Sequence, residues 1–221
     1  MVDVVQAKNF GKRSWLAGLI SLGVVLLVII FISRSSPPEE FLGTELTSAS
    51  PATPFELTDQ FGQTVSLSDY KGKVTLLTFL YTNCPDVCPV VTSQLRTARE
   101  MLGSIADEVA FVAISLDPER DSVEAARAFS DSWDMTGKWA FLVGDEEELS
   151  PIWKAYYVDP AINAQSHDDE DAHAEGASEH QFLVIHSTPV YLIDREGIMR
   201  VVSTPPLDID SLVHDIKLLV N

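Results

Sequence analysis

Residues 81–89 of this chain read Tyr81-Thr82-Asn83-Cys84-Pro85-Asp86-Val87-Cys88-Pro89. They contain the two cysteines of a 221-residue chain, and they lie between a strand-like apolar run at 74–80 and an amphipathic, helix-like pattern at 90–102. Two thiols at i and i+4 on the first turn of a helix project from the same side, and the positive end of the helix dipole favours thiolate over thiol. The stretch therefore predicts a thiol pair that either closes a disulfide or holds a soft metal ion.

The segments around the cysteines alternate between strand-like and helix-like patterns. Residues 55–57 and 64–67 alternate with a period of two around a turn at 59–62, which predicts a hairpin. The remaining patterns predict strands at 109–116, 139–143, 189–194 and 198–202, and helices at 117–133, 146–156 and 208–220. Asp117 is expected to cap the first of these helices, with Pro118 at its first position. This alternation predicts an α/β domain with a mostly parallel sheet covered on both faces.

The chain is strongly acidic, with 33 Asp and Glu residues against 15 Lys and Arg and a formal net charge of −18. Nucleic-acid-binding proteins need a basic face to neutralise phosphates, so this composition excludes that class. The acidic excess fits a protein that attracts cations or a cationic partner. With 46% hydrophobic residues the chain can build a full core without a disulfide framework, so two cysteines in a large domain indicate a functional site.

The N-terminal part predicts a transmembrane anchor. Residues 15–32 form an uncharged run in which Ser21 is the one polar residue. As a helix the run would span about 27 Å, close to the thickness of the hydrocarbon core of a bilayer. Lys and Arg side chains at positions 8, 12 and 13 precede it. The positive-inside rule then places residues 1–14 in the cytoplasm and the rest of the chain on the periplasmic side of a bacterial inner membrane.

The alternative for this apolar run is a cleaved signal peptide, although no small-x-small cleavage site follows Ile32 directly. Residues 33–53 are rich in Ser, Pro, Thr and Glu, which predicts a flexible linker. Residues 54–221 are then expected to form the folded domain.

Three motifs in this domain resemble the Sco/SenC family: the stretch at 82–89, Asp117-Pro118-Glu119-Arg120-Asp121, and His186-Ser187 ahead of the strand pattern at 190–194. The resemblance extends from about Pro54 to the C-terminus. It implies a thioredoxin-like fold, with a central mixed sheet flanked by helices and an N-terminal hairpin. It also implies a membrane-anchored copper protein that helps to assemble the binuclear copper site of cytochrome c oxidase. Some members of the family act as thiol–disulfide reductants.

The ligand chemistry agrees with copper. Two thiolates and one imidazole suit Cu(I) and give a three-coordinate site that is open to ligand exchange. We expect Cys84, Cys88 and His186 to be the metal ligands, because His186 precedes a strand that in this fold ends beside the cysteines. Structural zinc is the second choice, since a tetrahedral site would need a fourth protein ligand and the chain has no second Cys or His pair of that kind.

A thiol–disulfide oxidoreductase is the alternative function. Cys84 would attack a substrate disulfide and Cys88 would resolve the mixed disulfide; a thiol peroxidase is a third choice. Pro189 keeps this alternative open, because copper-binding Sco proteins often lack proline there, whereas in thioredoxin-like oxidoreductases the Thr-Pro bond at this place is typically cis. His186 discriminates the two functions, since a reductase does not require it.

Three other features of the sequence concern charged side chains. The acidic, His-containing stretch at 167–180 lacks apolar periodicity, which predicts either a solvated, disordered loop or a loop that collects copper for the main site. Asp86 is expected to act on the helix N-terminus electrostatically rather than to bind metal. Asp117 and Arg120 are expected to be helix-start residues.

Overall fold

The computed structural model of the chain describes residues 21–23, 25, 40–46, 50–158, 160 and 188–221. The chain divides into two units, residues 1–40 and 41–221, and every element described below belongs to the second unit. Most of the predicted anchor at 15–32, the whole acidic stretch at 167–180 and His186 lie outside the described residues. Within the described ranges, no helix has the length and apolar character needed to cross a membrane.

The second unit is built on one eight-stranded sheet. Its strands are β1 (Thr44–Glu45), β2 (Glu56–Asp59), β3 (Thr64–Ser66), β4 (Val74–Leu80), β5 (Val109–Ser115), β6 (Ala140–Val143), β7 (Val190–Ile193) and β8 (Met199–Ser203). They lie in the order β1-β8-β7-β4-β5-β6-β2-β3. Among the described strands, only the β4–β5 and β5–β6 pairs are parallel.

The mixed sheet implied by the family resemblance is thus present, and the expectation of a mostly parallel sheet was wrong. The physical reason lies in the connections. Strand–helix–strand units join the three central strands, which must therefore run parallel. Hairpins supply the strands at both sides of this centre, and hairpin strands are antiparallel.

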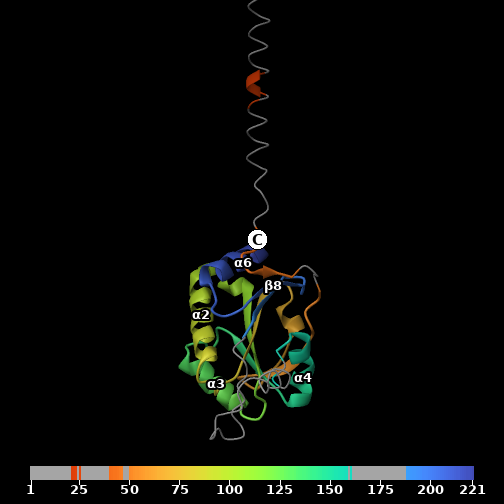
Figure 1. Cartoon of the computed structure of the whole chain (residues 1–221), viewed down its shortest axis with the longest axis vertical. Coiled ribbons are helices and arrows are strands. Elements are labelled where there is room, and N and C mark those ends of the chain that lie inside the picture. The colour runs from red at the N-terminus through yellow and green to blue at the C-terminus, as the bar shows by residue number, and fades with distance from the viewer. Residues whose placement is uncertain (1–20, 24, 26–39, 47–49, 159, 161–187) are drawn as a thin grey trace, which may run out of the picture. The chain divides into compact units, whose positions relative to one another are not determined.

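The helices are α2 (Val87–Leu102), α3 (Val123–Ser132), α4 (Glu146–Ala155) and α6 (Ile209–Val220), with short 3-10 helices η1 (Leu67–Tyr70) and η2 (Gly103–Glu108). Figure 1 shows α2 and α4 on opposite sides of the sheet. Every residue of β4 and β5 is buried, as expected for central strands covered on both faces. Helix α2 buries one stripe of side chains, namely Cys88, Val91, Thr92, Leu95, Ala98 and Leu102.

Two helices begin at other residues than the sequence predicts: α3 begins later than predicted, and α2 begins earlier. Helix α3 begins at Val123, and Ser122 caps it by accepting the Ala125 N–H at 3.2 Å. Residues 117–120, which the sequence predicts as its first turn, form a separate turn because Asp117 bonds Arg120 within the turn. Helix α2 begins at residue 87, three positions before its apolar pattern, and this places Cys88 on its first turn. Cys84 lies in the loop before the helix, so the expectation that both thiols lie on the first turn was wrong for Cys84.

A short N-terminal strap, residues 41–46, adds the edge strand β1 to β8. The backbone N–H groups of Leu42 and Gly43 each donate to the carboxylate of Asp215 on α6 at 2.8 Å. Gly43 lies so close to β8 that an added Cβ would stand 2.6 Å from Val201. The strap is therefore held by both main-chain pairing and a buried carboxylate.

The strap lies inside the segment 33–53 that the sequence predicts to be a linker. Its two-residue strand is too short to show an alternating pattern, so its pairing was not visible in the sequence. Further along the same segment, Pro51 bridges to Ile198 and Ala52 is buried. The folded unit accordingly begins at Phe41 rather than near Pro54.

Candidate thiol and metal site

The end of β4 and the start of α2 bring the two cysteines together. Both are free thiols; Cys84 is 8% exposed and Cys88 is fully buried. The Cys88 N–H donates to the Cys84 sulfur at 3.4 Å, and the Cys84 N–H donates to the Tyr81 carbonyl at 3.3 Å. The Asp86 side chain, at the N-cap position, makes no capping hydrogen bond. The Cys84 sulfur therefore accepts a helix-start N–H, a role that a polar cap side chain usually fills.

This environment stabilises the thiolate of Cys84. The hydrogen bond from the Cys88 thiol, the N–H groups at the helix start and the Tyr81 hydroxyl lower the pKa of Cys84 to about 5, and burial only partly opposes them. Cys84 is consequently ionised at neutral pH, as expected for a sulfur at a helix N-terminus.

Cys88 behaves in the opposite way. Its hydrogen bond to Cys84 and its burial raise its pKa above the ordinary thiol range. Burial, followed by the hydrogen bond to Cys84, likewise raises the pKa of Tyr81. The pair thus contains the thiolate of Cys84 and the thiol of Cys88, and the Cys88 thiol donates a hydrogen bond to the Cys84 sulfur. Such an unsymmetrical pair suits a nucleophile with a resolving partner, and its two sulfurs equally suit a soft metal ion.

A buried polar cluster supports the loop that carries Cys84. Asp121 is 5% exposed and accepts hydrogen bonds from the backbone and the hydroxyl of Thr82 and from the hydroxyl of Ser115. Sequence reasoning missed this cluster. Asp121 stood in a motif that the family resemblance included, yet the expected role at a helix start was assigned to its neighbours Asp117 and Arg120. These two form an ion pair within their turn.

The third predicted ligand, His186, lies outside the described residues, and it stays a prediction. Within those residues, no group of three or more His, Cys, Asp or Glu side chains could hold a metal ion. The nearest described position, Thr188, leads into β7. Thr78 of β4 pairs with Val190, and its hydroxyl donates to the Pro189 carbonyl at 3.1 Å. The chain therefore enters β7 beside the end of β4 that leads to the cysteines.

The peptide bond between Thr188 and Pro189 is trans. Within the described residues, the cis bond is the one between Pro205 and Pro206. The cis arrangement that is typical of thioredoxin-like oxidoreductases at this position is thus not found.

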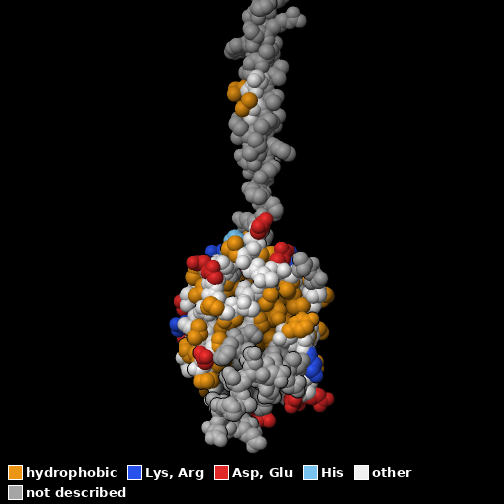
Figure 2. Space-filling model, in the orientation of Figure 1, with side chains coloured by type: hydrophobic (Ala, Val, Ile, Leu, Met, Phe, Trp, Pro, Cys, Tyr) orange, Lys and Arg blue, Asp and Glu red, His pale blue; other side chains and the backbone are white. Residues whose placement is uncertain are grey.

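The charges around the site agree with the acidic composition. On the face shown in Figure 2, the described Asp and Glu side chains are scattered over the domain and Lys and Arg side chains are few.

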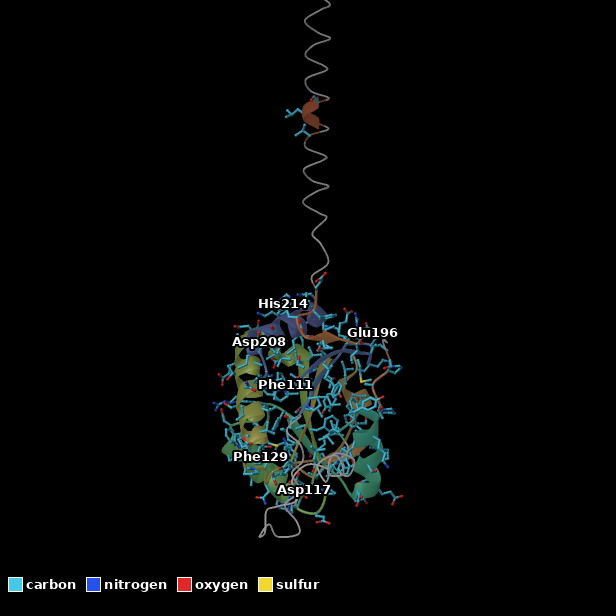
Figure 3. All side chains as sticks on the ribbon, viewed as in Figure 1. Phe111, Asp117, Phe129, Glu196, Asp208 and His214 are labelled. Carbon is cyan, nitrogen blue, oxygen red and sulfur yellow. The ribbon has the colours of Figure 1, made fainter. Side chains whose placement is uncertain are left out.

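The position of His214 can be judged from Asp117. Leu80 of β4 pairs with Ser115 of β5, so Asp117, two residues further on, marks the end of the sheet that carries the cysteines. Figure 3 shows His214 at the opposite end of the domain from Asp117. His214 is therefore remote from the thiol pair.

The mixed sheet, with a thiol pair between its central strand and the following helix, defines a thioredoxin-like α/β protein with a dithiol site. The SCO1/SenC family model matches residues 44–221, which is more than half of the chain. The chain belongs to the SCO1/SenC family, as the three sequence motifs predicted.

Three comparisons illustrate the relationship. The SCO2-like protein of Rickettsia prowazekii is 28% identical over 144 residues, which cover 65% of this chain and 64% of that protein. The chain thus spans slightly less than two thirds of this curated relative. The copper-bound structure of Bradyrhizobium japonicum ScoI is 31% identical with a TM-score of 0.60, covering 77% of this chain and 99% of that one.

A third comparison is with BsSco, which is described as having a disulfide switch and as a member of the Sco family of cytochrome c oxidase assembly proteins. Its structure has a TM-score of 0.62 and covers 80% of this chain and 97% of that one. At 23% identity, this likeness supports the fold alone.

Proposed function

We propose that this chain is a membrane-anchored metallochaperone that assists assembly of a copper site in cytochrome c oxidase. The observation that carries the proposal is the pair of free, buried thiols at the start of α2, in a family that includes the copper-bound ScoI. Cys84, Cys88 and His186 hold the copper. Two thiolates and an imidazole prefer Cu(I) among biological metals.

The two cysteines have different roles in loading. Cys84 is already a thiolate at neutral pH, so it offers the first ligand without losing a proton. The raised pKa of Cys88 means that its proton leaves when the metal binds, because the cation competes with the proton for the sulfur. Loading at neutral pH therefore releases about one proton per copper ion.

Cu(I) titration of the reduced whole chain in detergent, against a chromophoric Cu(I) chelator, tests the proposal. We expect one copper per chain and loss of tight binding in Cys84→Ser and Cys88→Ser. His186→Ala should weaken binding far more than His214→Ala, the matched control at the other end of the domain. Equal affinity of the two His variants would remove His186 from the site, and unchanged affinity of the Cys variants would refute the proposal.

The placement of the site in the cell is part of the same proposal. Residues 15–32 anchor the chain in the bacterial inner membrane, and the strap at 41–46 begins the folded unit shortly after. The site then faces the periplasm, where it can meet the copper-site subunit of the oxidase. Accessibility of single cysteines introduced into residues 1–14 and into the domain, measured with a membrane-impermeant thiol reagent on a Cys84→Ala, Cys88→Ala background, checks this orientation.

A second function, thiol–disulfide exchange, is favoured by the difference between the two thiols. A thiolate at Cys84 beside a protonated Cys88 is the arrangement of an attacking and a resolving cysteine. Attack on a substrate disulfide by Cys84 gives a mixed disulfide, which Cys88 then cleaves to leave a Cys84–Cys88 disulfide and a reduced substrate. Weak, His186-independent copper binding together with rapid exchange with an oxidised dithiol peptide would make this the principal function.

A further inference from the structure

The residue two positions before Cys84 is held by a side chain from a distant part of the sequence. One carboxylate oxygen of Asp121 accepts the Thr82 backbone N–H at 2.9 Å and the Thr82 hydroxyl at 2.6 Å. Both bonds reach across 39 positions in the chain. They fix the backbone and the side chain of Thr82 at the same time.

The second carboxylate oxygen of Asp121 ties the same group to the sheet. It accepts the Ser115 hydroxyl at 2.6 Å, and the Ser115 oxygen in turn accepts the Asp117 N–H at 3.0 Å. Asp121 itself donates its N–H to the Asp117 carbonyl at 2.8 Å. The carboxylate thus joins the end of β5, the turn at 117–120 and the loop that carries Cys84.

Burying the Asp121 carboxylate costs hydration free energy, which is more than a contact that only fills space would require. Asp121 is 5% exposed, and the ion pairs found among the described residues do not include it. A buried carboxylate without a cation is retained only when hydrogen bonds compensate its lost hydration, and a fully bonded network of this kind selects one local geometry. An apolar side chain could fill the same space but could not fix the Thr82 backbone.

We propose that Asp121 is a positioning residue for the dithiol site. By holding Thr82, it fixes the turn from Tyr81 to Cys84 on the end of β4 and keeps the Cys84 sulfur within reach of the first turn of α2. Asp121 acts through Thr82 and does not touch the metal. The inference deepens the proposed copper function, and it applies equally to the dithiol–disulfide couple, because both require the two sulfurs in a defined geometry.

Four variants of the whole chain in detergent test this role. Asp121→Ala removes all acceptors, whereas Asp121→Asn keeps a carbonyl oxygen that can accept both Thr82 bonds. Thr82→Val removes the hydroxyl that donates to Asp121 while nearly keeping the shape of the side chain, and Thr82→Ser keeps a hydroxyl that can make the same bond. Thr97→Val is the matched control, because the Thr97 hydroxyl bonds the Ser93 carbonyl on the same helix α2, away from the cluster.

Two readouts are measured on each folded variant: Cu(I) affinity by chelator competition and the equilibrium constant of the Cys84–Cys88 disulfide in a dithiothreitol buffer. Outer-shell changes typically lower metal affinity by about 10- to 100-fold, and we expect a loss of that size for Asp121→Ala. Thr82→Val should share part of the loss and shift the disulfide equilibrium. Asp121→Asn and Thr82→Ser should stay near the wild type, as should Thr97→Val.

Several outcomes overturn the proposal. One is unchanged affinity and disulfide equilibrium in Thr82→Val, the milder change, which leaves the Asp121 carboxylate and its bond to Ser115 in place. Another is an equal loss in Asp121→Asn and Asp121→Ala, which would show that charge rather than geometry matters. Failure of the wild type to bind Cu(I) refutes the copper function instead, and the disulfide equilibrium then still decides the role of Asp121.

Discussion

Above about pH 6, Cys84 should react with iodoacetamide at a rate that hardly depends on pH. The Cys88 thiol, the helix-start N–H groups and the Tyr81 hydroxyl hold the pKa of Cys84 at about 5. An ordinary cysteine has a pKa of about 8.5, so its alkylation rate rises through the neutral range and beyond. Cys88 is buried and has a raised pKa, so it should not contribute to the signal.

The size of the effect follows from two opposing factors. At pH 6 Cys84 is roughly 90% ionised, whereas an ordinary cysteine is roughly 0.3% ionised. Because nucleophilicity falls with pKa, the Cys84 thiolate is intrinsically about 40-fold less reactive than an ordinary thiolate. Relative to an unstructured cysteine peptide, Cys84 should therefore react about 8-fold faster at pH 6 and about 30-fold slower at pH 9. Partial burial slows Cys84 at every pH, so the informative quantity is the roughly 200-fold change in this ratio.

Mass spectrometry of the reduced chain after timed alkylation between pH 4 and pH 9 measures the profile. The Cys84→Ala variant should show almost no alkylation, which confirms that the signal comes from Cys84. In Cys88→Ala the midpoint should move to higher pH, because the largest influence that lowers the pKa of Cys84 is gone. A wild-type midpoint near pH 8 would refute the reasoning, as would an unchanged midpoint in Cys88→Ala.

Three further outcomes are expected. Tyr81→Phe should also move the alkylation midpoint of Cys84 to higher pH, by less than Cys88→Ala does, because the Tyr81 hydrogen bond is the weaker influence. Asp215→Ala should lower the free energy of unfolding by about 1.5–3 kcal/mol in urea titrations, because the strap at 41–46 loses two hydrogen bonds to a charged group. Leu95→Ala on the buried face of α2 should lower it by about 2–5 kcal/mol through the cavity that remains.

Each of these expectations has a contrary result. A Tyr81→Phe midpoint that stays at the wild-type value would mean that the hydroxyl does not reach the Cys84 sulfur. Limited proteolysis provides a second measurement for Asp215→Ala, and a strap as resistant to cleavage as in the wild type would show that β1 pairing holds it alone. A loss below about 1 kcal/mol in Leu95→Ala would mean that neighbouring side chains fill the space.

The thiol pair and its setting could be predicted from the sequence because the signals are local. Cys84 and Cys88 are four positions apart, and an apolar run and an amphipathic helix flank them. The same holds for α4, whose observed start at Glu146 agrees with the predicted helix at 146–156; the structure adds a capping box formed by the Asp145 and Glu148 side chains. Such features depend on neighbours within one turn of the chain, so the sequence alone contains the required information.

Contacts between distant segments could not be predicted in this way. The strap is held by Asp215, more than 170 positions away, and Thr82 by Asp121, 39 positions away. No periodic pattern marks either carboxylate as buried, and Asp121 was passed over in favour of Asp117 and Arg120. The direction of the outer strands was likewise decided by how the hairpins dock on the central strands.

The sequence by itself therefore determined the chemistry: two soft sulfur ligands four positions apart, between a strand and a helix, in an acidic chain with an apolar N-terminal segment. Only the tertiary structure decided that the two thiols are unequal. The pKa of Cys84 falls and that of Cys88 rises because folding sets a hydrogen bond between the two side chains, buries Cys88 more deeply and directs further N–H and O–H donors at Cys84. Desolvation and hydrogen-bond direction exist only once the chain has folded, and no residue pattern encodes them directly.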